Sequence, residues 1–340
     1  MAWLFFKTGA CILGFATYIQ KRIIYISITY LINMQITLRQ IEIFSAIAHS
    51  ENVTRAAEHL SISQSAASNA LLELERQFDC PLFDRIGKSL RLNSTGRGLL
   101  AQAEELLARA ADIEGFLAGG TLGPLAVGAT LTIGNYLATL IVAQYLHLHP
   151  TSKIQLHVAN THSIVEQLLR FELDIGLIEG EASEADLLLE HWLDDEMVVI
   201  CSPQHPLANG ENASIAMLSQ QNWIVREQGS GTRALFDRVI GSQLGRLNIR
   251  LELEHTEAIK RTVESGLGLA CLSRLSLREA FRRGSLVEVA TPQFDLKRRF
   301  YFARHRNRYI SPATQHFLDL CHELSHGASS TEDLKLPYFA

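Results

Sequence analysis

The stretch NVTRAAEHLSISQSAASNALLELERQFDCPLFDRIGK, residues 52–88, decides how the N-terminal part of the chain folds. It holds two helical patterns, one over residues 52–60 and one from about Ser63, separated by the tight turn Ser61–Ser63. The second pattern opens with SQSAASNA, where a core helix would carry large apolar side chains. Small side chains suit a helix pressed against a large polar surface. The arrangement therefore predicts a helix-turn-helix whose second helix enters the DNA major groove.

Polar side chains at the start of this second helix are candidates for contact with phosphates and base edges. The segment after Pro81 predicts a hairpin, a wing with basic residues near its tip. The candidate DNA-binding residues are Gln64, Ser65, Ser68, Asn69, Arg85 and Lys88. A small helical bundle without a ligand is the alternative, because residues 34–93 carry six Lys/Arg against seven Asp/Glu.

A long helix is predicted from about Ser94 to Leu117. Its apolar residues recur at a period of 3.5, which suits a seam against a second helix. They are Leu99, Ala103, Leu106, Ala110, Ile113 and Leu117. The alternative is a helix that lies on its own domain, since the run is shorter than a firm coiled-coil assignment needs. We favour the seam, and with it a homodimer.

Glycines and a proline at 119–124 predict a hinge, and beyond it apolar strand patterns alternate with helical ones for more than 200 residues. Such alternation predicts an α/β fold with parallel sheets covered on both faces. Its length favours two Rossmann-like lobes over one. The closing segment HGASSTEDLKLPYFA, residues 326–340, has no periodicity and is expected to be a mobile tail.

Two places in this part combine a strand end, a helix start and hydroxyl groups, as anion sites do. One is GSGTR, residues 229–233, which offers Ser230 and Thr232 after the strand WIVRE. The other is the strand LAVGAT, which is predicted to end in Thr130-Leu131-Thr132 just before a helix that starts near Gly134. Thr161 opens a further helix and is a third candidate. The alternative is that these hydroxyls only cap helices and that Arg233 is a solvated charge.

Composition limits the function classes. Among 340 residues the net charge is −5, so DNA binding must rest on a local surface. Five cysteines lie far apart without a CxxC pair, which favours reduced thiols in a cytoplasmic protein over disulfides or zinc. The sequence has no GxSxG, GxxxxGK[ST] or HExxH motif, so we expect no enzyme, no cofactor and no metal site.

The first 33 residues are apolar but differ from the rest of the chain. Lys21 and Arg22 split them into runs too short to span a bilayer core of ~30 Å. A membrane anchor is the alternative to an extension upstream of a true start at Met34. We favour the start at Met34 and expect no membrane partner.

Residues 34 to about 325 resemble a LysR-type transcriptional regulator. LRQIEIF, TRAAEHLSISQSAASNALLELE and PLFDR match the family's N-terminal signature, although the family usually carries Arg where this chain has Asn69. The pieces LDIGLIEG, REQGSGTR and EAIKRTVESGLGLACLS are similar to the YeiE-type members, relatives of the regulators of sulfur assimilation. The resemblance implies a winged helix-turn-helix, a linker-helix dimer, tetramers, and a two-lobed effector domain of the type 2 periplasmic-binding-protein fold. It also implies a small anionic effector such as sulfite.

We therefore interpret the chain as a cytoplasmic regulator that binds double-stranded promoter DNA and is switched by a small anion between two lobes. The rival hypothesis is a solute-binding or enzymatic α/β protein whose N-terminal helices serve only assembly. The predicted parts are an extension (1–33), a winged helix-turn-helix (34–93), a linker helix (94–118), an effector domain (119–325) and a tail (326–340).

Overall fold

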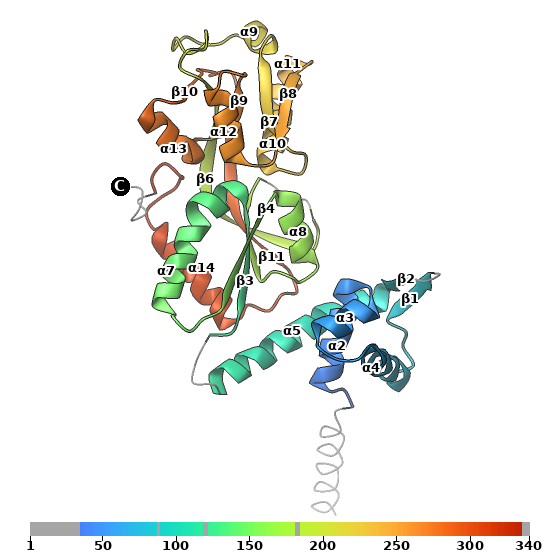
Figure 1. Cartoon of the computed structure of the whole chain (residues 1–340). Coiled ribbons are helices and arrows are strands. Elements are labelled where there is room, and N and C mark those ends of the chain that lie inside the picture. Colours follow the sequence, from blue (N-terminus) through green and yellow to red (C-terminus); the bar gives the residue numbers. More distant parts are fainter. Residues whose placement is uncertain (1–34, 87–88, 118–121, 181–183, 335–340) are drawn as a thin grey trace, which may run out of the picture. The chain divides into compact units, whose positions relative to one another are not determined.

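The structure is a computed structural model that describes residues 35–86, 89–117, 122–180 and 184–334 (Figure 1). These residues belong to two compact units, one ending at Ala103 and one beginning at Glu104. The expected N-terminal extension, 1–33, lies outside the described residues. In the part of the chain that is described, no helix is long and apolar enough to cross a membrane.

The N-terminal unit contains three helices, a two-stranded antiparallel hairpin and the start of a fourth, long helix. Its elements are α2 (Leu38–Ser50), α3 (Val53–His59), α4 (Gln64–Gln77), β1 (Phe83–Ile86), β2 (Ser89–Leu92) and the first part of α5 (Ser94–Leu117). Local capping sets the helix starts: the Asn52 side chain accepts from the first amides of α3, and Ser63 accepts from the Ala66 amide of α4. Ser61 between them has a φ of 54°, a left-handed turn. These residues build the predicted helix-turn-helix.

Helix α5 exposes part of its predicted apolar stripe. Leu106, Ile113 and Leu117 are 45%, 61% and 77% exposed, whereas Ala103 on the same stripe is buried. Among the described residues, none covers these large apolar side chains, which is the pattern expected of a helix that pairs with another.

The second unit consists of two α/β lobes joined by two long strands (Figure 1). Lobe I contains β3 (Leu125–Thr130), α6 (Leu131–Ile133), the π-helical turn η1 (Gly134–Ala138), α7 (Thr139–Leu148), β4 (Ile154–Ala159), α8 (Thr161–Leu169), β5 (Ile175–Glu179) and α14 (Pro312–Leu324). Lobe II contains α9 (Ile215–Ser219), β7 (Asn222–Arg226), α10 (Gly231–Phe236), the π-helical turn η2 (Asp237–Gly241), α11 (Ser242–Leu244), β8 (Asn248–Leu253), α12 (Thr256–Glu264), β9 (Ala270–Ser273), α13 (Arg274–Arg283) and β10 (Val287–Glu288). The joining strands are β6 (Leu187–Cys201) and β11 (Lys297–His305).

The sheet is mixed rather than purely parallel. Its strand order is β10-β6-β11-β5-β3-β4, and β9 also pairs with β6. Strand β3 is parallel to β4 and β5, and β7 is parallel to β8, as the alternating pattern predicts. The joining strands β6 and β11 are antiparallel to each other, because each crosses between the lobes in the opposite direction. The predicted two-lobed α/β fold is confirmed. The predicted parallel pairing holds for β3 with β4 and β5 and for β7 with β8, whereas the pairs that involve β6 or β11 are antiparallel.

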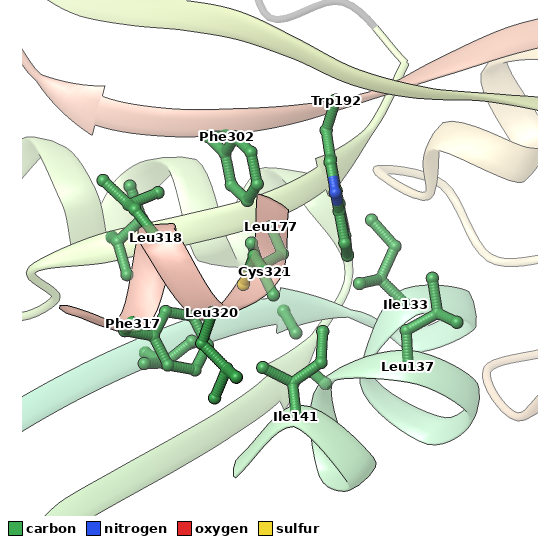
Figure 2. Packing of buried hydrophobic residues seen from close by; sticks show 14 of the residues in the cluster. Ile133, Leu137, Ile141, Leu177, Trp192, Phe302, Phe317, Leu318, Leu320 and Cys321 are labelled. Carbon is green, nitrogen blue, oxygen red and sulfur yellow. The ribbon is translucent and has the colours of Figure 1, made fainter. Parts of the chain in front are cut away.

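Apolar clusters cover both faces of the lobe I sheet. On one face, Ile141 of α7 and Phe317 of α14 pack with Trp192 of β6 in a single cluster. The Trp192 and Phe302 rings stack, with centroids 4.9 Å apart and planes at 28°. Figure 2 shows both side chains in this cluster. On the other face, α8 contributes Ile164 to a second cluster. This burial holds the strand ends, where the candidate residues lie, in fixed positions.

The sequence predicts a mobile tail from residue 326, but within residues 326–334 the structure shows side chains packed against lobe I. Thr331 is 1% exposed, and Leu334 is buried in the core cluster of lobe I. Backbone hydrogen bonds join this segment to Asp194 of β6. A polar composition allowed no prediction of this docking, because the partners lie far away in the sequence. Residues 335–340 lie outside the described part.

Candidate effector site and DNA-reading helix

A buried arginine lies where the two long strands pass from one lobe to the other. Arg298 of β11 is the register partner of Asp195 on β6, and its side chain is 2% exposed. Its Nε donates to Asp195 Oδ2 over 2.7 Å, and its Nη1 forms an ion pair with Glu179 at the end of β5. Burial disfavours the cation, but the two carboxylates outweigh this effect and hold the pKa of Arg298 above its ordinary value. One cation faces two buried carboxylates, which leaves one negative charge in excess.

Two of the predicted effector residues, one from each lobe, meet at this guanidinium. Arg298 donates to Thr232 Oγ1 over 3.0 Å and to Thr132 Oγ1 over 3.3 Å. The Thr132 hydroxyl in turn donates to Glu179 Oε2 over 2.9 Å, and the Thr232 hydroxyl lies 3.5 Å from the same oxygen. Both threonines are buried. The structure therefore brings Thr132 and Thr232 together, but their hydroxyls already have protein partners.

A cavity of about 290 Å³ lies beside this cluster and is lined by both lobes. Lobe I contributes Thr161 and His162 from α8, and lobe II contributes Ser230 and Arg238. Among the residues that the structure describes, none forms an ion pair with Arg238. Arg298 also lines the cavity, so two guanidinium groups face it, together with the carboxylates Glu179 and Glu184. Of the five predicted effector residues, only Thr161 and Ser230 reach this space.

The glycine loop of lobe II touches the start of α8 in lobe I. The Gly231 amide donates to Thr161 Oγ1 over 3.1 Å, and the His162 amide donates to the Gly229 carbonyl over 3.1 Å. A Cβ atom at Gly231 would stand 2.3 Å from the Glu179 carbonyl oxygen, so only glycine permits this approach. The lobes are closed against each other at this point.

Thr130 is placed less favourably than predicted. It is 1% exposed, and its hydroxyl donates to the Leu177 carbonyl over 3.5 Å. It occupies the N-cap position of α6 without a side-chain cap bond, and Ser230 occupies that of α10 in the same way. The hydroxyls of Thr130 and Ser230 therefore do not cap these helices, contrary to the alternative interpretation.

Arg233 is not the solvated charge of the alternative interpretation. It is 7% exposed, and its guanidinium binds Asp237 over 2.9 Å and Glu252 over 2.7 Å. It also donates to the Arg226 carbonyl over 2.8 Å. These contacts anchor the start of α10 within lobe II, so Arg233 supports the glycine loop instead of facing solvent.

A second contact between the lobes was not predicted from the sequence. The Tyr136 hydroxyl of lobe I donates to Glu257 Oε1 of α12 over 2.5 Å, and Lys260 Nζ lies 3.2 Å from the same hydroxyl. Burial, followed by the neighbouring Glu257 carboxylate, raises the pKa of Tyr136. Lys260 is 5% exposed and pairs with Glu257 of its own lobe. This second contact between the lobes therefore also includes a buried charged side chain.

The signal for the buried cluster was present in the sequence but weak. Glu179 follows four apolar residues of a buried strand, and Arg298 lies in the run KRRFYFAR, whose other members alternate between the two faces. A charged residue at an inward position of a strand indicates a buried ion pair. The sequence does not show which distant strand supplies the partner.

In the N-terminal unit, the start of α4 is presented outward. Gln64, Ser65 and Asn69 are exposed and Ser68 is half-buried, whereas Ala67 and Leu71 face the helical core. The Ser63 hydroxyl lies 3.1 Å from that of Ser65, which leaves Ser65 at the outer edge of the turn. These side chains can hydrogen-bond a ligand without unfolding the helix.

The wing is described only in part. Arg85 belongs to β1, where its backbone pairs with Leu90 of β2. Lys88, the other predicted wing residue, lies outside the described residues.

Comparison with known proteins places these two units in one family. Residues 38–97 match the model described as bacterial regulatory helix-turn-helix protein, lysR family, and residues 118–325 match the LysR substrate binding domain. The chain is 41% identical over 288 residues to the HTH-type transcriptional regulator YeiE of Escherichia coli, which covers 85% of this chain and 98% of YeiE. This relative is named as a transcriptional regulator and not as an enzyme.

Solved structures agree with the fold. A full-length OxyR variant from Pseudomonas aeruginosa superposes with a TM-score of 0.65 at 24% identity, covering 87% of this chain and 96% of that one. The Synechocystis CcmR regulatory domain in complex with 2-PG superposes with a TM-score of 0.56 at 29% identity, covering 60% of this chain and 98% of that one.

Proposed function

Since this chain belongs to the LysR family of bacterial transcriptional regulators, and so is a DNA-binding regulator with an effector-binding domain, we propose that its effector is a small oxyanion, sulfite or a similar compound. The proposal places the anion in the cavity between the lobes. It adds that the bound anion changes the geometry of a cytoplasmic homodimer or tetramer. The rival hypothesis of a solute-binding or enzymatic protein is set aside, because the similar proteins are named regulators.

The observation that carries the proposal is the character of the cavity. Its volume of about 290 Å³ is at the lower end of small-molecule sites, ~300–1,000 Å³. Arg298 and Arg238 face it, and guanidinium groups bind oxyanions through paired hydrogen bonds. The backbone at Gly229–Gly231 adds glycines that let an anion approach the main chain. Among the described residues that line the cavity there is no Phe, Tyr or Trp, the side chains on which a large apolar ligand would pack.

Glu179 is the group with which an oxyanion would compete. Its carboxylate now accepts the hydroxyl of Thr132 and the guanidinium of Arg298, which are the donors a sulfite oxygen would use. An anion that took this place would release Glu179 and draw Thr132 and Thr232 toward itself. Because an effector shifts an equilibrium only through different contacts in the two states, this exchange supplies the required difference in affinity.

The oligomer part of the proposal rests on α5. Leu106, Ile113 and Leu117 are exposed at heptad-like spacing, and pairing two copies of the helix would bury them. Two DNA-reading heads per dimer would also offset the nearly balanced charge of residues 34–93, because each copy adds its own phosphate contacts. A change in the angle between lobes would then alter the distance between heads.

Isothermal titration calorimetry with sulfite, sulfate, phosphate and neutral glycerol tests the effector class. We expect heat from the oxyanions only, and an affinity at least about tenfold weaker in Thr132→Val and in Thr232→Val. Thr314→Val is the matched control, because Thr314 is equally buried but lies in α14 with its hydroxyl 3.0 Å from that of Ser311. Equal heats from all four compounds, or unchanged affinity in both cleft variants, would contradict the proposal.

Glu179→Gln tests the competition directly. It removes one negative charge next to the proposed anion while keeping the side-chain shape. At ~4 Å, one unit charge contributes ~1–4 kcal/mol of repulsion for dielectric constants of about 80 to 20, so sulfite affinity should rise by at least about fivefold. An affinity equal to or below that of the wild type would show that the anion does not share the site of Glu179.

A further inference from the structure

The last described residues of the chain form a short strap across β6. We use the name strap for residues Ser329–Leu334. The Asp194 amide donates to the Ser329 carbonyl over 3.0 Å, and the Thr331 amide donates to the Asp194 carbonyl over 2.8 Å. The strap therefore pairs with β6 beside Asp195, the residue that binds Arg298.

Both ends of the strap are held. At one end, Asp333 accepts the hydroxyls of Ser329 and Ser330, which closes a tight turn, and at the other the Leu334 side chain is buried in the core cluster of lobe I. Arg274 of α13 pairs with Glu332 over 2.9 Å. The strap thus contacts elements of both lobes at the point where the strands cross.

The hydroxyl of Thr331 enters the buried charge cluster. It donates to Asp195 Oδ1 over 2.9 Å, while the other oxygen of Asp195 accepts Arg298 Nε over 2.7 Å. Ser273 supplies the only other side-chain donor to Oδ1 among the described residues, over 2.8 Å. A continuous path of hydrogen bonds runs from Thr331 through Asp195 and Arg298 to Thr132 in lobe I.

We propose that Thr331 is a positioning residue for the site between the lobes: by fixing Asp195 it fixes Arg298, and Arg298 holds the threonines of both lobes. Hydrogen bonds to a buried carboxylate are stronger than neutral ones, and Asp195 is fully buried. The cluster carries an excess negative charge, so each donor to a carboxylate matters to its geometry. Without the hydroxyl, Ser273 is the only side-chain donor left to Asp195 Oδ1 among the described residues, so Asp195 turns more freely and holds Arg298 less firmly. The strap thereby sets how firmly the lobes are closed before any effector binds.

Amide hydrogen exchange on the full chain tests this without an effector. The compared proteins are the wild type, Thr331→Val, Thr331→Ser and Thr314→Val. In Thr331→Val, exchange should be about tenfold faster over residues 131–138 and 230–236, the segments that carry the two threonines. Thr331→Ser keeps the hydroxyl and should behave as the wild type. Thr314→Val removes an equally buried hydroxyl outside the cluster and should leave both segments unchanged.

The proposal would be overturned if both segments of Thr331→Val exchanged at the wild-type rate. It would also be overturned if exchange in Thr314→Val were accelerated as much as in Thr331→Val, because that would indicate a general loss of stability. If Thr331→Val does not fold, Leu334→Ala loosens the strap from its other end and should speed amide exchange in the same two segments. Exchange at the wild-type rate in Leu334→Ala would also overturn the proposal. The effector part rests on the proposed function: sulfite affinity should fall about tenfold in Thr331→Val and be kept in Thr331→Ser. If the wild type binds no sulfite, the effector proposal fails, whereas the exchange result still decides the role of Thr331.

Discussion

Replacing Arg298 by methionine should destabilise the two-lobed unit by about 3–5 kcal/mol. The change leaves Glu179 and Asp195 without their cation at positions that are 2% and 0% exposed. Lost hydrogen bonds to charged groups, at ~1.5–3 kcal/mol each, would by themselves add to more than this. The carboxylates keep donors, however: Thr132 still serves Glu179, and Thr331 still serves Asp195. Because these donors remain, the loss of unfolding free energy should stay near the ~3–5 kcal/mol of one broken buried ion pair.

Urea unfolding followed by tryptophan fluorescence measures this loss lobe by lobe. Trp192 lies in the core of lobe I and Trp223 in the core of lobe II, so each reports on one lobe. A chain that starts at Met34 removes Trp3, the remaining tryptophan. With Trp192→Phe or Trp223→Phe in that background, both transitions should shift to lower urea together, because Arg298 binds residues of both lobes.

The neighbouring residue provides the control. Arg299 is 64% exposed, and its guanidinium lies 3.8 Å from Asp194, so Arg299→Met should change stability by less than about 1 kcal/mol. Adding Glu179→Gln to Arg298→Met should restore part of the loss, because one of the two unpaired charges is gone. A loss in Arg298→Met no larger than that in Arg299→Met, or no recovery in the double variant, would refute the account of the cluster.

In the DNA-reading unit, Ser65→Glu or Arg85→Ala should weaken binding to upstream DNA by ~1–3 kcal/mol in a gel shift at fixed salt while sulfite affinity stays unchanged; intact DNA affinity in the double variant would remove the assigned role of α4 and the wing. Changing Leu106 and Ile113 together to Asp should give monomers or aggregates in sedimentation, because charges would face each other across the proposed seam, and a wild-type mass would show that α5 pairs elsewhere. Gly231→Ala places a Cβ atom 2.3 Å from a carbonyl oxygen of β5 and should hold the lobes apart. Scattering should then show a larger radius of gyration with each lobe still folded, whereas an unchanged radius would contradict closure at this glycine.

Local chemistry made the N-terminal unit predictable from the sequence. Asn52 and Ser63 cap their own helices through amides two or three residues away, so the helix-turn-helix boundaries follow from neighbours in the chain. The apolar period of the linker helix and the alternation of strands and helices are equally local. Strand ends followed by helix starts also pointed to Thr132 and Thr232, and the fold brings these two to one guanidinium.

Tertiary structure alone decided what those hydroxyls bind. In KRRFYFAR, Lys297 and Arg299 are exposed, whereas Arg298 between them is buried. Arg298 is buried because its face of β11 is covered by residues from both lobes. Glu179, Asp195 and Thr331 converge on that face from three separate strands or segments. The docking of the strap has the same origin, since its polar residues show no period of their own. A pattern in sequence reports on contacts within a few residues, whereas a buried charge is stabilised only by partners that folding brings from elsewhere in the chain.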